Sequence, residues 1–189
     1  MTIYASVGVH PDYTLESEPG VAEIVGLAQH PKVIAIGETG LDYYRLSGDM
    51  EWQRDRFRTH IRAARECGKP LIIYTRSAAQ DTLRILSEER AGQAGGGMHC
   101  FTENLETALA AIDLGFHISF SGILTFKNAT LIKEVAKHIP LDKILIETDS
   151  PYLAPAPHLC KTNQPAYVIY VAEEIARLRN ISLQEVGAA

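Results

Sequence analysis

The sequence predicts an α/β fold, a (β/α) barrel of the TIM type that is incomplete because about six of the eight strands are present. The first observation is a series of short runs rich in Ile, Val and Leu and bounded by turn residues, which are typical of buried parallel strands. The second is that segments with apolar residues at helical spacing separate these runs. The third is that several runs end in a carboxylate or an imidazole, at the strand ends where barrel enzymes keep their active sites.

The first part of the chain predicts strands and helices in strict alternation. Strands are expected at residues 3–9, 33–38 and 70–76, and helices at residues 21–27 and 51–67. Gly68 follows the second helix, and glycine commonly ends a helix because it adopts the left-handed conformation without strain. This part therefore predicts two complete strand-and-helix pairs followed by a third strand.

The second part continues the alternation. Asn104 is placed to cap one helix and Gly115 to end it, and Ser182 with Glu185 has the spacing of a capping box. The glycine-rich residues 93–97 are expected to form a loop, because the Lys-Ser/Thr pair of a phosphate-binding loop does not follow them. Strands are expected at residues 98–101, 116–122 and 144–151, and helices at residues 83–86, 105–114, 128–138 and 167–178 and again from residue 182.

The length and the element order favour a single domain over residues 1–189. The rival fold is an open doubly wound sheet, which also tolerates six strands. Such a sheet gathers its ligands at one switch point, whereas the candidate ligands here follow several strands. The barrel is therefore the favoured fold.

Composition excludes several classes of protein. The formal net charge is -5, which argues against a broad basic surface for a nucleic-acid duplex. Three cysteines without C-x-x-C spacing are typical of a reduced chain rather than a disulfide scaffold. The chain lacks an apolar stretch near the roughly 20 residues that cross a bilayer, and it does not begin like a signal peptide. It is therefore expected in the cytoplasm, away from membranes.

Three candidate metal ligands follow three of the expected strands. Glu38 lies between two glycines at a strand end, His99 lies in the strand at residues 98–101, and Asp149 ends the last apolar run. Each has an ordinary alternative: a surface carboxylate, a core histidine and a turn-forming aspartate before Ser-Pro. Their repeated placement at strand ends favours a shared metal site.

Together these segments resemble the TatD family of metal-dependent deoxyribonucleases, relatives of the amidohydrolase barrels. The resemblance covers nearly the whole chain, in the family's order, and it is highly specific in GETGLDYY, HCFT, SFSGILTFKN and ETDSPYLAP. The matching segments lie at residues 8–11, 35–45, 69–78, 98–102, 115–129, 145–155 and 161–168.

The resemblance implies hydrolysis of DNA phosphodiester bonds, in single strands or at ends, with up to two divalent ions. It implies that Glu38 bridges the metals, that His99 binds one, and that Asp149 binds the other and orients the attacking water. Magnesium is the expected ion for a carboxylate-rich site, with zinc or manganese as alternatives. Glu38 and Asp149 are thus the expected catalytic residues.

Two departures from the family pattern affect the metal site. The chain contains no His-x-His pair, with which family members begin, so the first two strands and the extreme C-terminus are expected to be missing. Tyr74 stands where the family usually has histidine, and a neutral phenol is a poor metal ligand. One alternative is therefore an impaired barrel with residual metal binding and little nuclease activity, and another is a related barrel hydrolase of a small ester or amide.

Further polar residues are candidates for substrate binding. Arg76 and Arg45 could pair with phosphate, although surface ion pairs would explain them equally well. Tyr43 and Tyr44 could stack on bases or pack on the barrel rim. The other candidates are His10, Tyr74, Lys161 and Asn163, for which a turn, aromatic packing and solvated loop positions are the alternatives. The sequence leaves the oligomeric state open.

Overall fold

The computed structural model describes residues 2–44 and 48–189. The chain divides into two compact units. The first comprises residues 1–99 and 113–116, and the second comprises residues 100–112 and 117–189. Each unit is built from parallel strands and helices in alternation, as the sequence predicts.

Four parallel strands form the sheet of the first unit. They are β1 (Ala5–Val7), β2 (Val33–Asp42), β3 (Leu71–Arg76) and β4 (Gly96–Met98), and each pairs with the next along the chain. A doubly wound sheet would reverse direction from an inner strand, whereas this order proceeds in one direction only. The strand order is therefore that of a β/α barrel.

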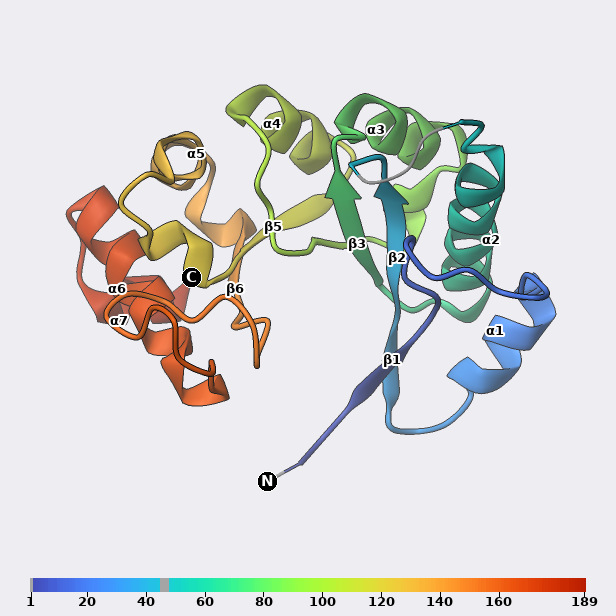
Figure 1. The fold of residues 1–189 in the computed structure, drawn as a ribbon, viewed down its shortest axis with the longest axis horizontal. Coiled ribbons are helices and arrows are strands. Elements are labelled where there is room, and N and C mark those ends of the chain that lie inside the picture. Colours follow the sequence, from blue (N-terminus) through green and yellow to red (C-terminus); the bar gives the residue numbers. More distant parts are fainter. Residues whose placement is uncertain (1, 45–47) are drawn as a thin grey trace. The chain divides into compact units, whose positions relative to one another are not determined.

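Helices of the first unit lie along one side of β1, β2 and β3 (Figure 1). They are α1 (Val21–Ala28), α2 (Glu51–Cys67) and α3 (Ala79–Glu88), with a short 3-10 helix at Ala91–Gln93. Gly68 ends α2 with a φ of 65°, as its position in the sequence predicts. The buried faces of α2 and the strands form a core that includes Ile36, Leu41, Phe57, Ile61, Ile73 and Met98.

Close approach of β2 and β3 depends on a glycine. Gly40 has a φ of +139°, and a Cβ atom at this position would lie 1.9 Å from the backbone oxygen of Tyr74. Any side chain would therefore push the two strands apart. The register that results pairs Gly40 with Tyr74 and Asp42 with Arg76, at the carboxyl ends of the two strands.

The second unit contains β5 (Phe116–Phe120) and β6 (Ile144–Ile146), which pair in parallel. Its core includes Phe101, Ile118, Phe120, Val135, Val171 and Ile175. Asn104 accepts a hydrogen bond from the amide of Thr107, and Ser182 forms the expected capping box with Glu185. The helices are α4 (Leu105–Asp113), α5 (Thr130–His138), α6 (Val168–Arg179) and α7 (Leu183–Ala188), with 3-10 helices at Gly122–Thr125, Leu141–Lys143 and Pro165–Tyr167.

Several strand boundaries differ from the sequence prediction, and β1 and β5 are shorter than expected. β4 begins inside the glycine-rich segment that was expected to be a loop, because Gly96 lies so close to Leu71 that only a glycine fits. β2 continues past Glu38 to Asp42, and β6 ends at Ile146 instead of reaching residue 151.

Among the residues described, none of the helices combines the length and the apolar character that crossing a bilayer requires.

Candidate active site

Glu38 lies between two imidazoles in the first unit. Its Oε1 atom is 3.6 Å from Nε2 of His10 and 3.5 Å from Nε2 of His99. All three side chains are partly exposed, so they are accessible to a solute. The structure therefore brings two of the expected ligands together and adds His10, which the sequence indicated only as a substrate contact.

The three side chains lie on or directly after three different strands of the first unit. Glu38 lies within β2, and His99 follows β4, where its amide donates to the Ile73 oxygen at 2.7 Å. His10 follows β1, and its Nδ1 atom interacts with the carboxylate of Asp12. A carboxylate on one ring nitrogen orients the other nitrogen, an arrangement common among metal-binding histidines.

Helix α2 supports the segment that carries His10. His60 is fully buried, its Nδ1 faces the Arg56 carbonyl at 2.8 Å, and its Nε2 accepts a 3.0 Å hydrogen bond from the Val9 amide. Burial lowers the pKa of His60, so its ring is held in the neutral form. The buried Arg56 donates to the carbonyls of His10 and Tyr13. These roles were not predicted, because they depend on packing between distant segments.

Tyr74 extends the same cluster along β3. Its ring centroid is 4.8 Å from that of His10, and its hydroxyl is 3.5 Å from Oδ2 of Asp42. Burial, followed by the negative charge of Asp42, raises the pKa of Tyr74 above its usual value. The side chain is therefore a neutral phenol beside His10, as its chemistry led us to expect.

Arg76 and Tyr44 form a stacked pair beyond Tyr74. The Arg76 guanidinium carbon is 3.8 Å from the Tyr44 ring centroid, and its Nη1 atom is 4.0 Å from Oδ2 of Asp42. Asp42 is almost fully buried and also accepts a 2.9 Å hydrogen bond from the Tyr44 amide. The sequence did not single out Asp42, although it lies in the GLDYY segment.

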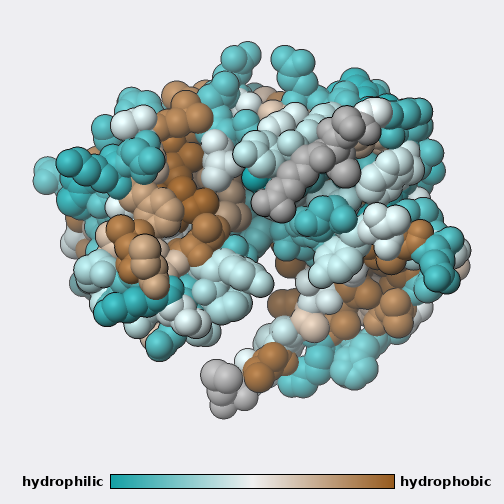
Figure 2. Space-filling view, in the orientation of Figure 1, coloured by the Kyte–Doolittle hydropathy of each residue, from teal (hydrophilic) through white to brown (hydrophobic). Residues whose placement is uncertain are grey.

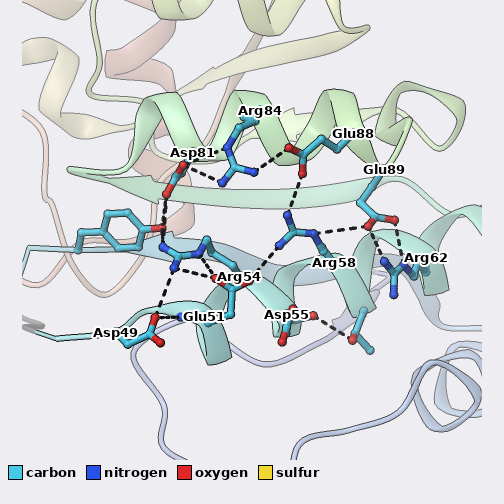
Figure 3. A network of polar contacts seen from close by, with 12 residues as sticks. Asp49, Glu51, Arg54, Asp55, Arg58, Arg62, Asp81, Arg84, Glu88 and Glu89 are labelled. Carbon is cyan, nitrogen blue, oxygen red and sulfur yellow. Dashed lines mark hydrogen bonds and ion pairs between the residues drawn. The ribbon is translucent and has the colours of Figure 1, made fainter.

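Figure 3 shows a charged network on α2 and α3, and Tyr43 is hydrogen-bonded to two of its members. Its hydroxyl donates to Asp81 at 2.8 Å and accepts from Arg54 at 3.2 Å. The network continues through alternating arginines and carboxylates of the two helices, among them Arg58, Arg62, Arg84, Glu88 and Glu89. Tyr43 therefore anchors the end of β2 to the helices.

A pocket of about 320 Å³ opens beside Glu38. Its lining combines the polar groups of Glu38 and His10 with an apolar wall, and consists of Gly8, Val9, His10, Tyr13, Leu15 and Glu38. A second pocket of about 280 Å³ shares Leu15 and reaches Ile24 and Leu27 on α1. Hydrophobic surface is visible beside the N-terminal strand and α1 in Figure 2.

The second unit holds the other candidates. Asp149 follows β6, and its backbone oxygen accepts a 2.9 Å hydrogen bond from the Tyr152 amide. Asn163 is buried, and its Nδ2 donates to the carbonyls of Thr148 and Tyr152 at 2.6 Å each. These bonds fix the segment on both sides of Asp149. Lys161 is exposed.

The nearby Glu147 belongs to the second unit as well. Its Oε1 accepts a 2.5 Å hydrogen bond from the Cys100 amide, and its own amide donates to the Phe120 carbonyl. The sequence did not single out Glu147, although it lies two residues before Asp149. Of the remaining candidates, Arg45 lies outside the described residues.

The donor atoms around Glu38 suit a divalent metal. Two ligands that each lie about 2.0–2.2 Å from one tetrahedral ion are separated by roughly 3.4 Å. The pairs Glu38–His10 and Glu38–His99 have separations of 3.6 Å and 3.5 Å, close to this value. Within the described part of the chain, however, no group of three or more His, Cys, Asp or Glu side chains is arranged to hold one ion.

Comparison with known protein families shows to which family the chain belongs. The family model described as "TatD related DNase" matches residues 1–189. The chain belongs to the TatD family. The Escherichia coli K12 protein named "Uncharacterized metal-dependent hydrolase YcfH" is 50% identical over 183 residues, which cover 96% of this chain and 68% of the relative. The Bacillus subtilis metal-dependent hydrolase YabD is 46% identical over 98% of this chain and 73% of its own length.

More distant TatD relatives include a named nuclease and two solved structures. The "3'-5' ssDNA/RNA exonuclease TatD" of Salmonella typhimurium is 32% identical over 98% of this chain and 74% of its own length. The crystal structure of the TatD homologue YJJV from Escherichia coli has a TM-score of 0.87 at 26% identity, covering 97% of this chain and 71% of that one. The TatD family hydrolase of Entamoeba histolytica has a TM-score of 0.83 at 27% identity over 97% and 70% of the two chains.

These TatD relationships confirm the predicted barrel-type fold and the class of enzyme. As a member of the TatD family, the chain is a metal-dependent hydrolase, and its fold is that of the solved TatD homologues. It spans between 68% and 74% of the length of the relatives named above. The family membership does not identify the metal or the substrate.

Proposed function

We propose that this TatD-family chain hydrolyses phosphodiester bonds of DNA, in single strands or at ends, with a divalent metal. The observation that carries the proposal is the position of Glu38 between His10 and His99, with an Oε1–Nε2 separation near 3.5 Å on each side. A carboxylate between two imidazoles, at the carboxyl ends of parallel strands, suits metal-assisted hydrolysis. The nuclease named among the relatives supports a nucleic-acid substrate.

Glu38 with His10 and Glu38 with His99 are the two proposed metal-binding pairs of the first unit. A bound divalent ion would polarise the phosphoryl group and lower the pKa of a water molecule. Glu38 can serve both imidazole pairs, which agrees with the bridging role implied by the family resemblance.

The remaining candidates are proposed to act on the substrate or to hold the segments that carry the site residues. Asp149 is the proposed second carboxylate that orients the attacking water, and Asn163 holds the Asp149 segment in place. Arg76 is proposed to bind phosphate, and Lys161 and Arg45 are proposed as weaker electrostatic contacts. Tyr74 contributes a neutral ring beside His10, and its hydroxyl donates a hydrogen bond to Asp42.

The metal preference follows from the donors. Magnesium, the ion expected from the sequence, prefers oxygen ligands and octahedral geometry. The presence of His10 beside Glu38 adds a second imidazole to the site, and imidazole suits zinc better than magnesium or manganese. We therefore propose zinc as the ion that supports the highest activity.

The test uses single-stranded oligonucleotides that carry a fluorophore at one end. The purified chain is incubated with magnesium, manganese or zinc, and the products are resolved by length. Replacing Glu38 with glutamine should lower the metal-dependent rate by about 100-fold or more, because removal of one electrostatic catalytic group typically costs that much. The matched control is Glu66→Gln, a change at an exposed position of α2. Equal rates for the Glu38→Gln variant and the unaltered chain would refute the proposal.

A second candidate function is hydrolysis of a small ester or amide. The pocket beside Glu38 has a volume of about 320 Å³ and an apolar wall, which is within the range of sites for small molecules. Turnover of small esters without cleavage of oligonucleotides would favour this function. The absence of both activities, with metal binding retained, would favour an impaired barrel.

A further inference from the structure

Tyr44 presents an aromatic face at the carboxyl end of β2. Its side chain is 62% exposed, and the guanidinium of Arg76 lies 3.8 Å from its ring centroid. An exposed aromatic ring with an arginine against it offers both a surface for stacking and a positive charge. This combination suits a flat base attached to an anionic backbone.

The pair is held in place by a buried carboxylate. Asp42 is 5% exposed, and its two oxygens face Arg76 and the backbone amide of Tyr44. The Asp42 backbone is fixed in turn by Gln53 of α2, which is fully buried and accepts from the Asp42 amide at 2.8 Å. Asp42 and Gln53 therefore hold the stacked pair in place before a ligand binds. Binding a ligand to this pair then costs little conformational entropy.

The neighbouring Tyr43 is not equivalent to Tyr44. The Tyr43 hydroxyl is bonded to Asp81 and Arg54, and its side chain is only partly exposed. Tyr43 thus serves to anchor the loop, which leaves the ring of Tyr44 as the stacking surface. The sequence alone could not distinguish the two tyrosines.

We propose that Tyr44 and Arg76 form a subsite that stacks an unpaired nucleobase of single-stranded nucleic acid, several nucleotides from the bond cleaved beside Glu38. This inference rests on the proposed nuclease function. Asp42, whose carboxylate faces both members of the pair, lies four residues beyond Glu38 in β2, about 13 Å along the strand at 3.3 Å per residue. Stacked nucleotides advance by about 3.4 Å each, so a strand needs roughly four nucleotides to reach from one place to the other.

The subsite has a consequence for the substrate class. A base inside a duplex already has both faces stacked, so only a single-stranded segment can place a base on Tyr44. A stacked trinucleotide spans only about 10 Å, which is less than the roughly 13 Å from Glu38 to Asp42. The pair should therefore favour single strands longer than about four nucleotides.

The experiment measures KM and kcat for a three-residue and a twelve-residue oligothymidylate. Tyr44→Ala should raise KM for the longer substrate about fivefold or more, the lower end of the loss expected for one base stack. It should leave kcat unchanged, and it should leave both constants unchanged for the short substrate. Tyr44→Phe should behave like the unaltered chain, because stacking needs the ring and not the hydroxyl.

Tyr4→Ala is the matched control. Tyr4 is also an exposed tyrosine with a cation over its ring, since Lys32 Nζ lies 5.2 Å from the ring centroid, but it precedes β1. This variant should cleave both substrates normally. Circular dichroism and the melting temperature confirm that each variant is folded.

Three results would each contradict part of the account. Equal KM values for the Tyr44→Ala variant and the unaltered chain, with oligonucleotides still cleaved, would overturn the subsite and leave the nuclease function standing. The subsite would also be overturned if Tyr44→Phe were as weak as Tyr44→Ala. Failure of the unaltered chain to bind or cleave either oligonucleotide would overturn the nuclease function itself, and the subsite with it.

Discussion

Three side chains on or after different strands are the proposed metal-binding residues of the first unit. Glu38 and His99 could be proposed from the sequence, because each lies at or near the end of an apolar run. His10 was harder to recognise as their neighbour, since His-Pro-Asp is typical of a turn. Its place beside Glu38 results from the pairing of β1 with β2, which is a contact between distant segments.

A substitution at Tyr74 tests whether a further imidazole raises the metal affinity of this cluster. Replacing Tyr74 with histidine should tighten zinc or manganese binding about tenfold, because the new imidazole would stand beside His10 where the phenol now lies. Isothermal titration calorimetry measures the change. Tyr74→Phe is the control, and its metal affinity should equal that of the unaltered chain. An unchanged affinity for Tyr74→His would show that position 74 does not face the metal.

At the scale of elements, α2 positions the active-site loop after β1. His60 accepts from the Val9 amide, and Arg56 binds the carbonyls of His10 and Tyr13 as well as the carboxylate of Glu18. The amphipathic pattern of α2 predicted the helix but not these contacts. Polar residues on an apolar helix face show that the face is unusual, but they do not identify the loop that they hold.

His60 makes stability depend on pH. The pKa of His60 is lowered in the folded state, so the unfolded chain binds more protons when the pH falls below about 6.5. The free energy of unfolding should therefore be at its full value above pH 6.5 and fall as the pH decreases, by at most about 1.4 kcal/mol per pH unit from this group. Urea unfolding at several pH values measures the slope.

The variant His60→Gln provides the comparison for this slope. It removes the titrating group while keeping a polar side chain, so it should unfold at lower urea concentration and lose part of the pH dependence between pH 5 and 6.5. His138→Gln, at an exposed position of α5, should retain the full slope. An identical slope in the His60→Gln variant would contradict the assignment.

The strand boundaries also show how far sequence reasoning extends at this scale. The order and direction of the strands were predicted from apolar runs and turn residues. The start of β4 at Gly96 was missed, because a run of glycines indicates a loop unless a neighbouring backbone demands the space. The backbone of β3, which pairs with β4, needs this space. That contact exists only in the folded chain.

At the scale of the whole molecule, family membership and fold agree with the sequence prediction. The TatD family covers residues 1–189, and the solved homologues share the fold over 97% of the chain. The metal-dependent hydrolase class follows from this relationship. The part played by Asp149 remains a prediction, because it lies in the second unit.

The central claim is that Glu38, paired with His10 and with His99, binds the divalent metal on which hydrolysis depends. Calorimetric titration of the chain with manganese and zinc, after treatment with a chelator, tests it most directly. Binding should be saturable in the unaltered chain and in His138→Ala, and should weaken at least tenfold in Glu38→Gln, His10→Ala and His99→Ala. Metal affinities that are the same in all five proteins would contradict the claim.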